Sequence, residues 1–259
     1  MTNDWIKTDD EIARLKESGV RLAWVLETIM ASVRPGMTTK EIDRLSERLI
    51  FEQGGIPIFK GYGGSGRPFP ATLCTSLNEE VVHGIPSKKR IIREHDLLKL
   101  DIGMRYAGMV TDMARTVKVG TVTPQAEKLV AVTEESLRRG IAELRPGARI
   151  SAYARAVQSF VEANNFSVVR DLVGHGVGYE LHEDPQIPNY VSPEMHDFIL
   201  QPGMTLALEP MINIGTYRVR VAPDDWTFIT ADGKWSAHFE DTVVITDTGA
   251  EAVTRIGIE

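Results

Sequence analysis

The chain contains an internal repeat, which restricts the folds that it can adopt. Residues 199–209 (ILQPGMTLALE) align without a gap on residues 91–101 (IIREHDLLKLD). The alignment superimposes three pairs of identical aliphatic residues, and it matches Asp101 with Glu209. Because repeated segments commonly mark repeated structural units, this match takes precedence over local propensities.

Two further patterns recur in the same order along the chain. An Arg-Pro-Gly sequence at residues 34–36 returns at 145–147, and a His-x-x-Pro pattern at 83–86 returns at 182–185. Any one of these matches could arise by chance. Three matches in one order predict that the chain is internally duplicated.

The duplication predicts an α+β fold with two similar halves, about residues 1–120 and 121–259, in a single domain spanning 1–259. Each half would contain two helices, a strand and a hairpin. We expect the halves to pack around a pseudo-two-fold axis, with their antiparallel strands in a shared curved sheet and the helices on one face. The predicted helices begin at capping boxes 8–11 and 38–41, span 125–143, and run from Ser151 to about Asn164.

Residues 97–120 (LLKLDIGMRYAGMVTDMARTVKVG) predict a β-hairpin. A turn centred between Tyr106 and Ala107 places Asp101 directly opposite Asp112, about 5 Å away. Two such carboxylates repel each other by about 3 kcal/mol at an effective dielectric constant of about 20. A fold keeps this pair if cations neutralise it or if one carboxyl stays protonated. In the alternative, the register differs by one residue and both aspartates are solvated.

The duplication supplies partners for these two aspartates. Glu209 is the counterpart of Asp101, and Glu240 on the last strand is the expected counterpart of Asp112. His175 lies between two glycines, which permit close backbone approach, and is the fifth candidate ligand. The formal charge of this set, about −4, matches two divalent cations, for which Mn, Fe, Co and Zn all suit the ligands. Two such ions about 3.5–4 Å apart can hold a bridging hydroxide as nucleophile.

The two His-x-x-Pro histidines, His83 and His182, are expected on either side of this site. There they would donate protons or stabilise an oxyanion. Taken singly, each histidine is better interpreted as a turn or surface residue, and the metal-site role depends on the whole set.

The composition of the chain argues against several classes of protein. The chain has 259 residues and a formal net charge of −7, which argues against nucleic-acid binding. Its single cysteine, Cys74, excludes an intrachain disulfide. No apolar run reaches the length of a membrane span, and the N-terminus lacks the plan of a signal peptide. We therefore expect a cytoplasmic protein with no membrane partner.

Several motifs resemble those of type I methionine aminopeptidases, the two-metal family with the pita-bread fold. The resemblance extends over nearly the whole chain and rests on residues 78–86 (NEEVVHGIP), 101–103, Asp112, 174–185 (GHGVGYELHEDP), 187–190 (IPNY), 208–211 (LEPM), and Phe239-Glu240 followed by Thr242. It implies hydrolysis of the first peptide bond when residue one is methionine and residue two is small.

The resemblance also implies roles for individual residues. It assigns metal binding to the five candidate ligands, substrate contact to His83 and His182, and catalysis to these two histidines together with Glu209. The implied partners are the N-termini of nascent polypeptides, with docking on ribosomes left open. The sequence carries no sign of an oligomer, so we expect a monomer.

The residues that form the family's methionine-binding pocket match this sequence less completely than the metal ligands do. The resemblance places Phe69, Cys74, Leu181 and Trp226 in it, although each also reads as ordinary core packing. Residues 61–68 depart from the family, and a tyrosine that lines the pocket of some members is expected to be absent.

One departure favours a second enzyme class. Asp241 follows Glu240 where these aminopeptidases usually carry histidine, and residues 112–116 (DMART) look like those of proline-specific peptidases. Those relatives generally carry a separate N-terminal domain, for which this chain has no room. An X-Pro aminopeptidase or dipeptidase is therefore the alternative enzyme, and a non-catalytic binding protein on a degenerate pita-bread fold is the alternative outside enzymes.

Overall fold

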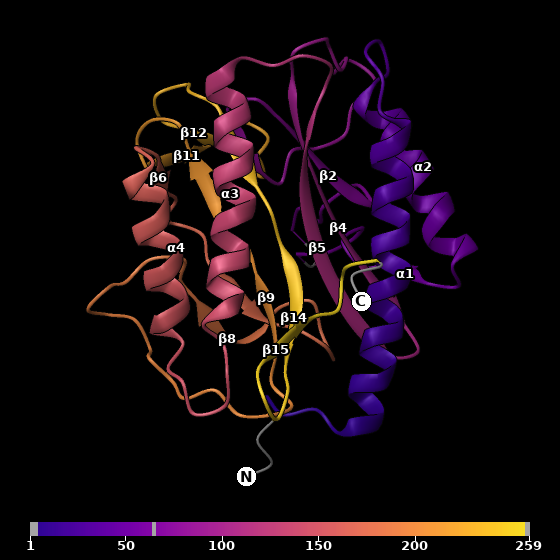
Figure 1. Ribbon diagram of the computed structural model, residues 1–259. Coiled ribbons are helices and arrows are strands. Elements are labelled where there is room, and N and C mark those ends of the chain that lie inside the picture. The colour runs from indigo at the N-terminus through magenta and orange to yellow at the C-terminus, as the bar shows by residue number, and fades with distance from the viewer. Residues whose placement is uncertain (1–4, 64–65, 257–259) are drawn as a thin grey trace.

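The computed structural model describes residues 5–63 and 66–256 (Figure 1). Four helices are present in these ranges: α1 (Asp9–Ser32), α2 (Thr39–Glu52), α3 (Pro124–Ala142) and α4 (Ser151–Ala163). The strands are β1 (Ile56–Pro57), β2 (Leu73–Leu77), β3 (Glu80–Val82), β4 (Leu97–Tyr106), β5 (Met109–Lys118), β6 (Ser167–Val168), β7 (Gly174–Gly176), β8 (Glu183–Ile187), β9 (Thr205–Leu208), β10 (Met211–Asn213), β11 (Val219–Val221), β12 (Phe228–Thr230), β13 (Ser236–His238), β14 (Asp241–Ile245) and β15 (Ala250–Ala252). The mixture of helices and antiparallel strands confirms the α+β prediction.

The first two helices begin at the predicted capping boxes. In α1 the Glu11 carboxylate accepts the backbone N–H of Thr8 at 2.8 Å, and the Thr8 hydroxyl accepts the N–H of Glu11 at 3.4 Å. The same reciprocal pattern links Thr38 and Glu41 at the start of α2. These bonds satisfy N–H groups that a helix start leaves without an intrahelical acceptor.

The internal duplication is visible in matching backbone hydrogen bonds. After α1, the N–H of Gly36 donates to the carbonyl of Ile92 at 2.8 Å. After α3, the N–H of Gly147 donates to the carbonyl of Leu200 at 2.9 Å. Both glycines have a positive φ, 92° and 83°, which glycine adopts without steric cost. The repeated Arg-Pro-Gly turns therefore contact segments that the internal alignment pairs, because Ile92 aligns with Leu200.

The strands do not form the continuous shared sheet that the sequence predicts. Among the described residues they divide into four separate sheets. Besides the pairing of β3 with β12 and a bridge between Ile6 and Met204, the halves meet at the bridge pair of Ala114 and Glu240. Their backbone N–H groups donate to each other's carbonyls at 3.3 and 2.9 Å. One cause of the division is Pro210, which separates β9 from β10 and has no N–H to continue a ladder. We call the contact between β5 and the segment that enters β14 the seam.

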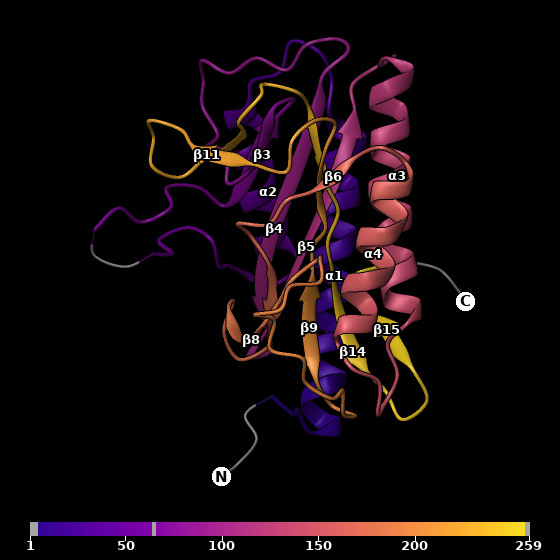
Figure 2. The same ribbon diagram turned by 90° about the vertical axis from the view of Figure 1, so that its left-hand side faces the viewer.

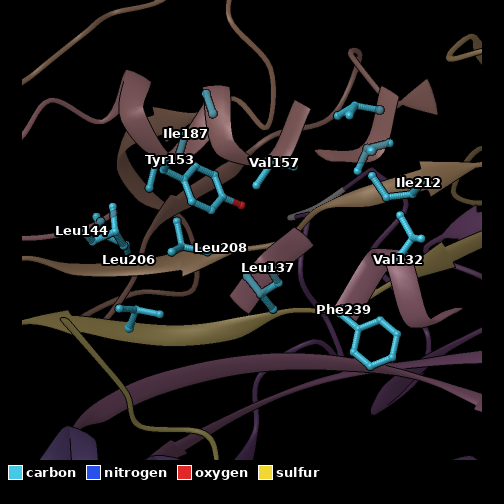
Figure 3. Packing of buried hydrophobic residues seen from close by; sticks show 14 of the residues in the cluster. Val132, Leu137, Leu144, Tyr153, Val157, Ile187, Leu206, Leu208, Ile212 and Phe239 are labelled. Atoms are coloured by element: carbon cyan, nitrogen blue, oxygen red, sulfur yellow. The ribbon is translucent and has the colours of Figure 1, made fainter. Parts of the chain in front are cut away.

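The helices cover one face of the strands, so the opposite face is left for the site. Figure 2 shows α3 and α4 on one side, while the segments around β3 and β11 extend on the other. In the C-terminal half, Leu137, Tyr153 and Val157 of these helices pack on Leu206 and Leu208 of β9 (Figure 3). A second cluster packs α1 and α2 on β2 and β4. Within residues 5–63 and 66–256, no helix combines the length and apolar character needed to cross a membrane.

The predicted hairpin exists as β4 and β5, with a tighter turn than expected. Tyr106 pairs with Met109, so only Ala107 and Gly108 form the turn. Both turn residues have positive φ values, 48° and 83°. This combination is typical of the type I′ turn, whose twist matches that of the flanking strands.

The turn changes how the two aspartates face each other. Asp101 pairs with Ala114, and Asp112 pairs with Gly103. The prediction that the aspartates lie directly opposite is therefore wrong. Moving the turn centre by one residue moves the pairing by two, so both aspartates stay on one face as diagonal neighbours about 7–8 Å apart rather than about 5 Å.

The buried hydroxyl of Tyr153 connects the C-terminal core to the segment that carries Glu209. It donates a hydrogen bond to Asn189 Oδ1 at 2.6 Å, and Asn189 Nδ2 donates to the backbone carbonyl of Glu209 at 3.2 Å. Tyr153 and Asn189 are both fully buried. Water cannot replace either partner without opening the core.

We expect Tyr153→Phe to lower the free energy of unfolding by about 1–3 kcal/mol, because it leaves the amide oxygen of Asn189 buried without a donor. Urea denaturation measures the change. Tyr190→Phe is the matched control, since the Tyr190 hydroxyl has no hydrogen-bond partner among the described residues. Equal losses in the two variants would contradict the assignment.

Candidate metal centre and substrate pocket

A cavity opens on the face that the helices leave free. All the residues that the sequence nominates for metal binding, catalysis or methionine recognition line it: His83, His182, Asp101, Asp112, His175, Glu209, Glu240, Phe69, Cys74, Leu181 and Trp226. Phe59 and Tyr62 also line the cavity and were not predicted.

Three of the candidate ligands converge closely, and they come from both halves of the chain. Asp112 on β5, His175 on β7 and Glu240 before β14 each offer a ligand atom, and these atoms lie within 4.8 Å of one another. Glu209 adjoins this group, with its Oε1 3.5 Å from His175 Nε2. Asp101 lies on β4, on the same face as Asp112.

The glycines around His175 fit the sequence interpretation. A Cβ on Gly174 would lie 2.4 Å from the carbonyl oxygen of Ala207, and one on Gly176 would lie 2.3 Å from that of Asp184. Both distances are too short for any side chain. The Nδ1 of His175 lies 2.9 Å from the carbonyl oxygen of Gly176. A proton shared in that bond leaves Nε2 with a lone pair toward Glu209, which is the form that binds metals.

Burial makes the charged form of every candidate carboxylate costly. It raises the pKa of Asp112 to about 7, and it raises the pKa of Glu240 and Glu209 well above the usual range, with the neighbouring acids adding to the shift. For Asp101, burial acts first and the charge of Asp112 second, again raising the pKa. Burial also lowers the pKa of His175 to about 3, so this imidazole is neutral and free to act as a ligand.

The residues present fit divalent cations. Asp101 Oδ1, Asp112 Oδ1 and Glu240 Oε1 are buried without a hydrogen-bond partner in the described part of the chain. In the same residues, no lysine or arginine forms an ion pair with any of the four carboxylates. Buried carboxylates require pairing or metal coordination. Oxygen-rich ligation with one imidazole suits borderline and hard divalent ions.

The two predicted catalytic histidines flank this group. His83 has a positive φ of 59°, and its ring lies 5.7 Å from that of Phe228. The ring of His182 lies 4.3 Å from that of His175, in an edge-to-face arrangement. An ion pair holds the loop that carries His182 in place, because Lys7 Nζ lies 2.6 Å from the carboxylate of the adjacent Glu183.

The apolar end of the cavity contains a tyrosine that the sequence interpretation missed. The rings of Phe69 and Trp226 meet edge to face at 5.3 Å, and Cys74 and Leu181 are buried beside them. Tyr62 lines the same cavity, and its hydroxyl hydrogen-bonds His182 Nδ1. The expectation that the pocket lacks a tyrosine is therefore wrong. An aromatic residue between glycines in an otherwise polar loop was the available signal.

His238 is a second residue that the sequence interpretation missed. It is buried, and neither ring nitrogen has a hydrogen-bond partner among the described residues. Its Nε2 lies 3.7 Å from Glu209 Oε2 and 4.0 Å from Glu240 Oε2. Its place two residues before Glu240 would have predicted this, because alternate residues of an extended segment share a face.

Comparison with known proteins places this arrangement in a family. The sequence model of Metallopeptidase family M24 matches residues 13–247. Methionine aminopeptidase 1 of Bacillus subtilis is 46% identical over 250 residues, covering 96% of this chain and 98% of the relative. The methionine aminopeptidase of Clostridium acetobutylicum is 44% identical, with the same coverage.

Solved structures agree with these sequence matches. The crystal structure of methionine aminopeptidase from Thermotoga maritima superimposes with a TM-score of 0.92 at 43% identity, covering 96% of this chain and 98% of that one. The prolidase of Pyrococcus horikoshii superimposes with a TM-score of 0.78 at 20% identity, over 65% of its own length, which shows a shared fold alone. The pita-bread fold is thereby confirmed, and the chain belongs to metallopeptidase family M24, among the methionine aminopeptidases.

Proposed function

We propose that this protein removes the N-terminal methionine from peptides and nascent proteins when the second residue is small. The observation that carries the proposal is the convergence of Asp112, His175 and Glu240 beside an apolar cavity, with no cationic side chain of the described residues to neutralise the acids. Together with Asp101 and Glu209 they would hold two divalent ions, drawn from Mn, Fe, Co or Zn.

Such ions, when bound, supply Lewis-acid chemistry that activates water and polarises a carbonyl. The protein's own groups do the rest. The Glu209 carboxylate accepts a proton from the nucleophile and returns it to the leaving amine. His83 and His182 donate hydrogen bonds to the substrate carbonyl as negative charge develops on its oxygen.

The apolar end of the cavity would select methionine. Phe69 and Trp226 present aromatic rings, and thioether sulfur packs favourably against ring edges. Cys74 and Leu181 close the pocket, and Tyr62 lies beside His182 at its mouth. A long, unbranched side chain fits this surface without leaving a polar group unpaired.

The proposed function also bears on the domain organisation, the oligomeric state and the location of the protein. We propose that residues 1–259 form a single catalytic domain, because ligands from both halves, about 1–120 and 121–259, complete one site. The protein would act as a monomer in the cytoplasm, where nascent N-termini arise. The alternative, an X-Pro aminopeptidase on the same scaffold, rests on Asp241 and on residues 112–116.

Substitution of Glu209 tests the catalytic assignment. We expect Glu209→Gln to lower kcat by about a hundredfold or more, because an amide cannot accept the proton that a general base must take. Initial rates on Met-Ala-Ser, with saturating metal, measure the effect. Glu143→Gln, at an exposed helix end, is the control, and a fully active Glu209→Gln enzyme would contradict the role.

A peptide panel tests the substrate class. We expect turnover of Met-Ala-Ser and little or none of Gly-Pro peptides, because the pocket presents an apolar, aromatic surface to residue one. Comparing kcat/KM across both peptides measures the preference. Turnover of the proline peptide alone would replace the proposal with the X-Pro alternative.

A further inference from the structure

Arg115 and Asp241 lie on the reverse side of the seam from the metal ligands. Consecutive residues of a strand point to opposite faces, so Asp241 points away from the face that Glu240 occupies. Both Arg115 and Asp241 line a groove between α1 and α3, and neither lines the substrate cavity. Figure 1 shows β5 and β14 running between these two helices.

Asp241 is fully buried and bound by two arginines. Its Oδ1 lies 2.6 Å from Arg115 Nη2, and its Oδ2 lies 2.6 Å from Arg255 Nη2. Arg255 Nε also donates to Oδ2 at 3.0 Å, and the hydroxyl of Thr254 donates to Oδ1 at 3.0 Å. The charge of Asp241 is therefore compensated by β5 on one side and by the C-terminal segment on the other.

Arg115 also hydrogen-bonds the backbone on both sides of the seam. Its Nη1 donates to the carbonyl of Ala114 at 2.9 Å and to that of Glu240 at 2.5 Å. These are the two residues of the bridge pair at the seam. Asp112 lies two residues from Ala114 on the same strand face, so the guanidinium fixes the backbone spacing between ligands Asp112 and Glu240.

We propose that Arg115 and Asp241, anchored by Arg255, form a clamp that positions Asp112 and Glu240 for metal binding and takes no part in substrate selection. The inference rests on the metal site of the proposed function. Arg115 and Asp241 are positioning residues, because they touch neither the cavity nor its ligand atoms. The features that resemble proline-specific peptidases thus act on the metal ligands and not on the peptide.

The affinity of the folded apoprotein for Mn²⁺, measured by calorimetry, tests the clamp. We expect Arg115→Met and Asp241→Asn each to weaken Mn²⁺ binding about 10–100-fold, the usual effect of losing a group that orients metal ligands. Arg115→Lys keeps the charge and loses the forked geometry, so its affinity for Mn²⁺ should lie between those of these variants and that of the wild type. If Arg115→Met does not fold, Arg255→Met tests the same clamp from its outer side.

Two comparisons separate positioning from general destabilisation. Lys16→Met removes an ion pair of 2.6 Å between α1 and Glu251 of β15, which also joins distant segments but lies in solvent. This control should leave Mn²⁺ affinity unchanged. Unchanged affinity in every folded clamp variant would overturn the proposal, even if their melting temperatures fall.

A separate measurement tests the claim that the clamp takes no part in substrate selection. The ratio of kcat/KM for Met-Ala-Ser over Gly-Pro peptides, at saturating Mn²⁺, should be the same in Asp241→Asn and in the wild type. A change of that ratio in Asp241→Asn, in either direction, would overturn the claim that the clamp takes no part in substrate selection. Weakened Mn²⁺ binding in a protein that cleaves neither peptide would support the clamp while rejecting the proposed function.

Discussion

Three buried carboxylates, Asp101, Asp112 and Glu240, crowd together with the partly buried Glu209 beside the imidazole of His175, and the fold has to accommodate their combined charge. Burial raises the pKa of Asp112 to about 7, and neighbouring acids add to the rise that burial causes in the pKa values of Asp101, Glu209 and Glu240. No arginine or lysine of the described residues pairs with them. A fold tolerates this arrangement when cations supply the missing charge, since an unpaired buried charge costs several kcal/mol.

The duplicated architecture explains how such a cluster can be assembled. Each half contributes acids from equivalent strands, so one seam between the halves brings both sets together. The strands around the seam are short and divided, and Pro210 interrupts the ladder next to Glu209. The helices on the far face supply the core that holds these short strands in place. Stability and chemistry are thus separated onto opposite faces.

The sequence carried enough information for the helices, the duplicated halves and most residues that line the cavity, but not for the division of the strands into four sheets. The repeat joined Asp101 to Glu209 across more than a hundred residues, which local patterns cannot do. It did not specify the hairpin register, because Ala107 in a positive-φ turn has no strong signature. The position of Tyr62 depends on the path of a loop, and His238 shares the face of Glu240 only because residues 238–240 are extended. Side-chain contacts such as Asp241 with Arg115 arise from tertiary packing alone.

Measuring the metal content of the protein shows whether these five side chains form a two-metal centre. Protein purified anaerobically, loaded with Mn²⁺ and freed of excess ion can be analysed by atomic emission alongside its activity. We expect about two Mn²⁺ ions per active chain at saturation, as a two-metal site requires. Full activity on Met-Ala-Ser in protein that retains no divalent metal would contradict it.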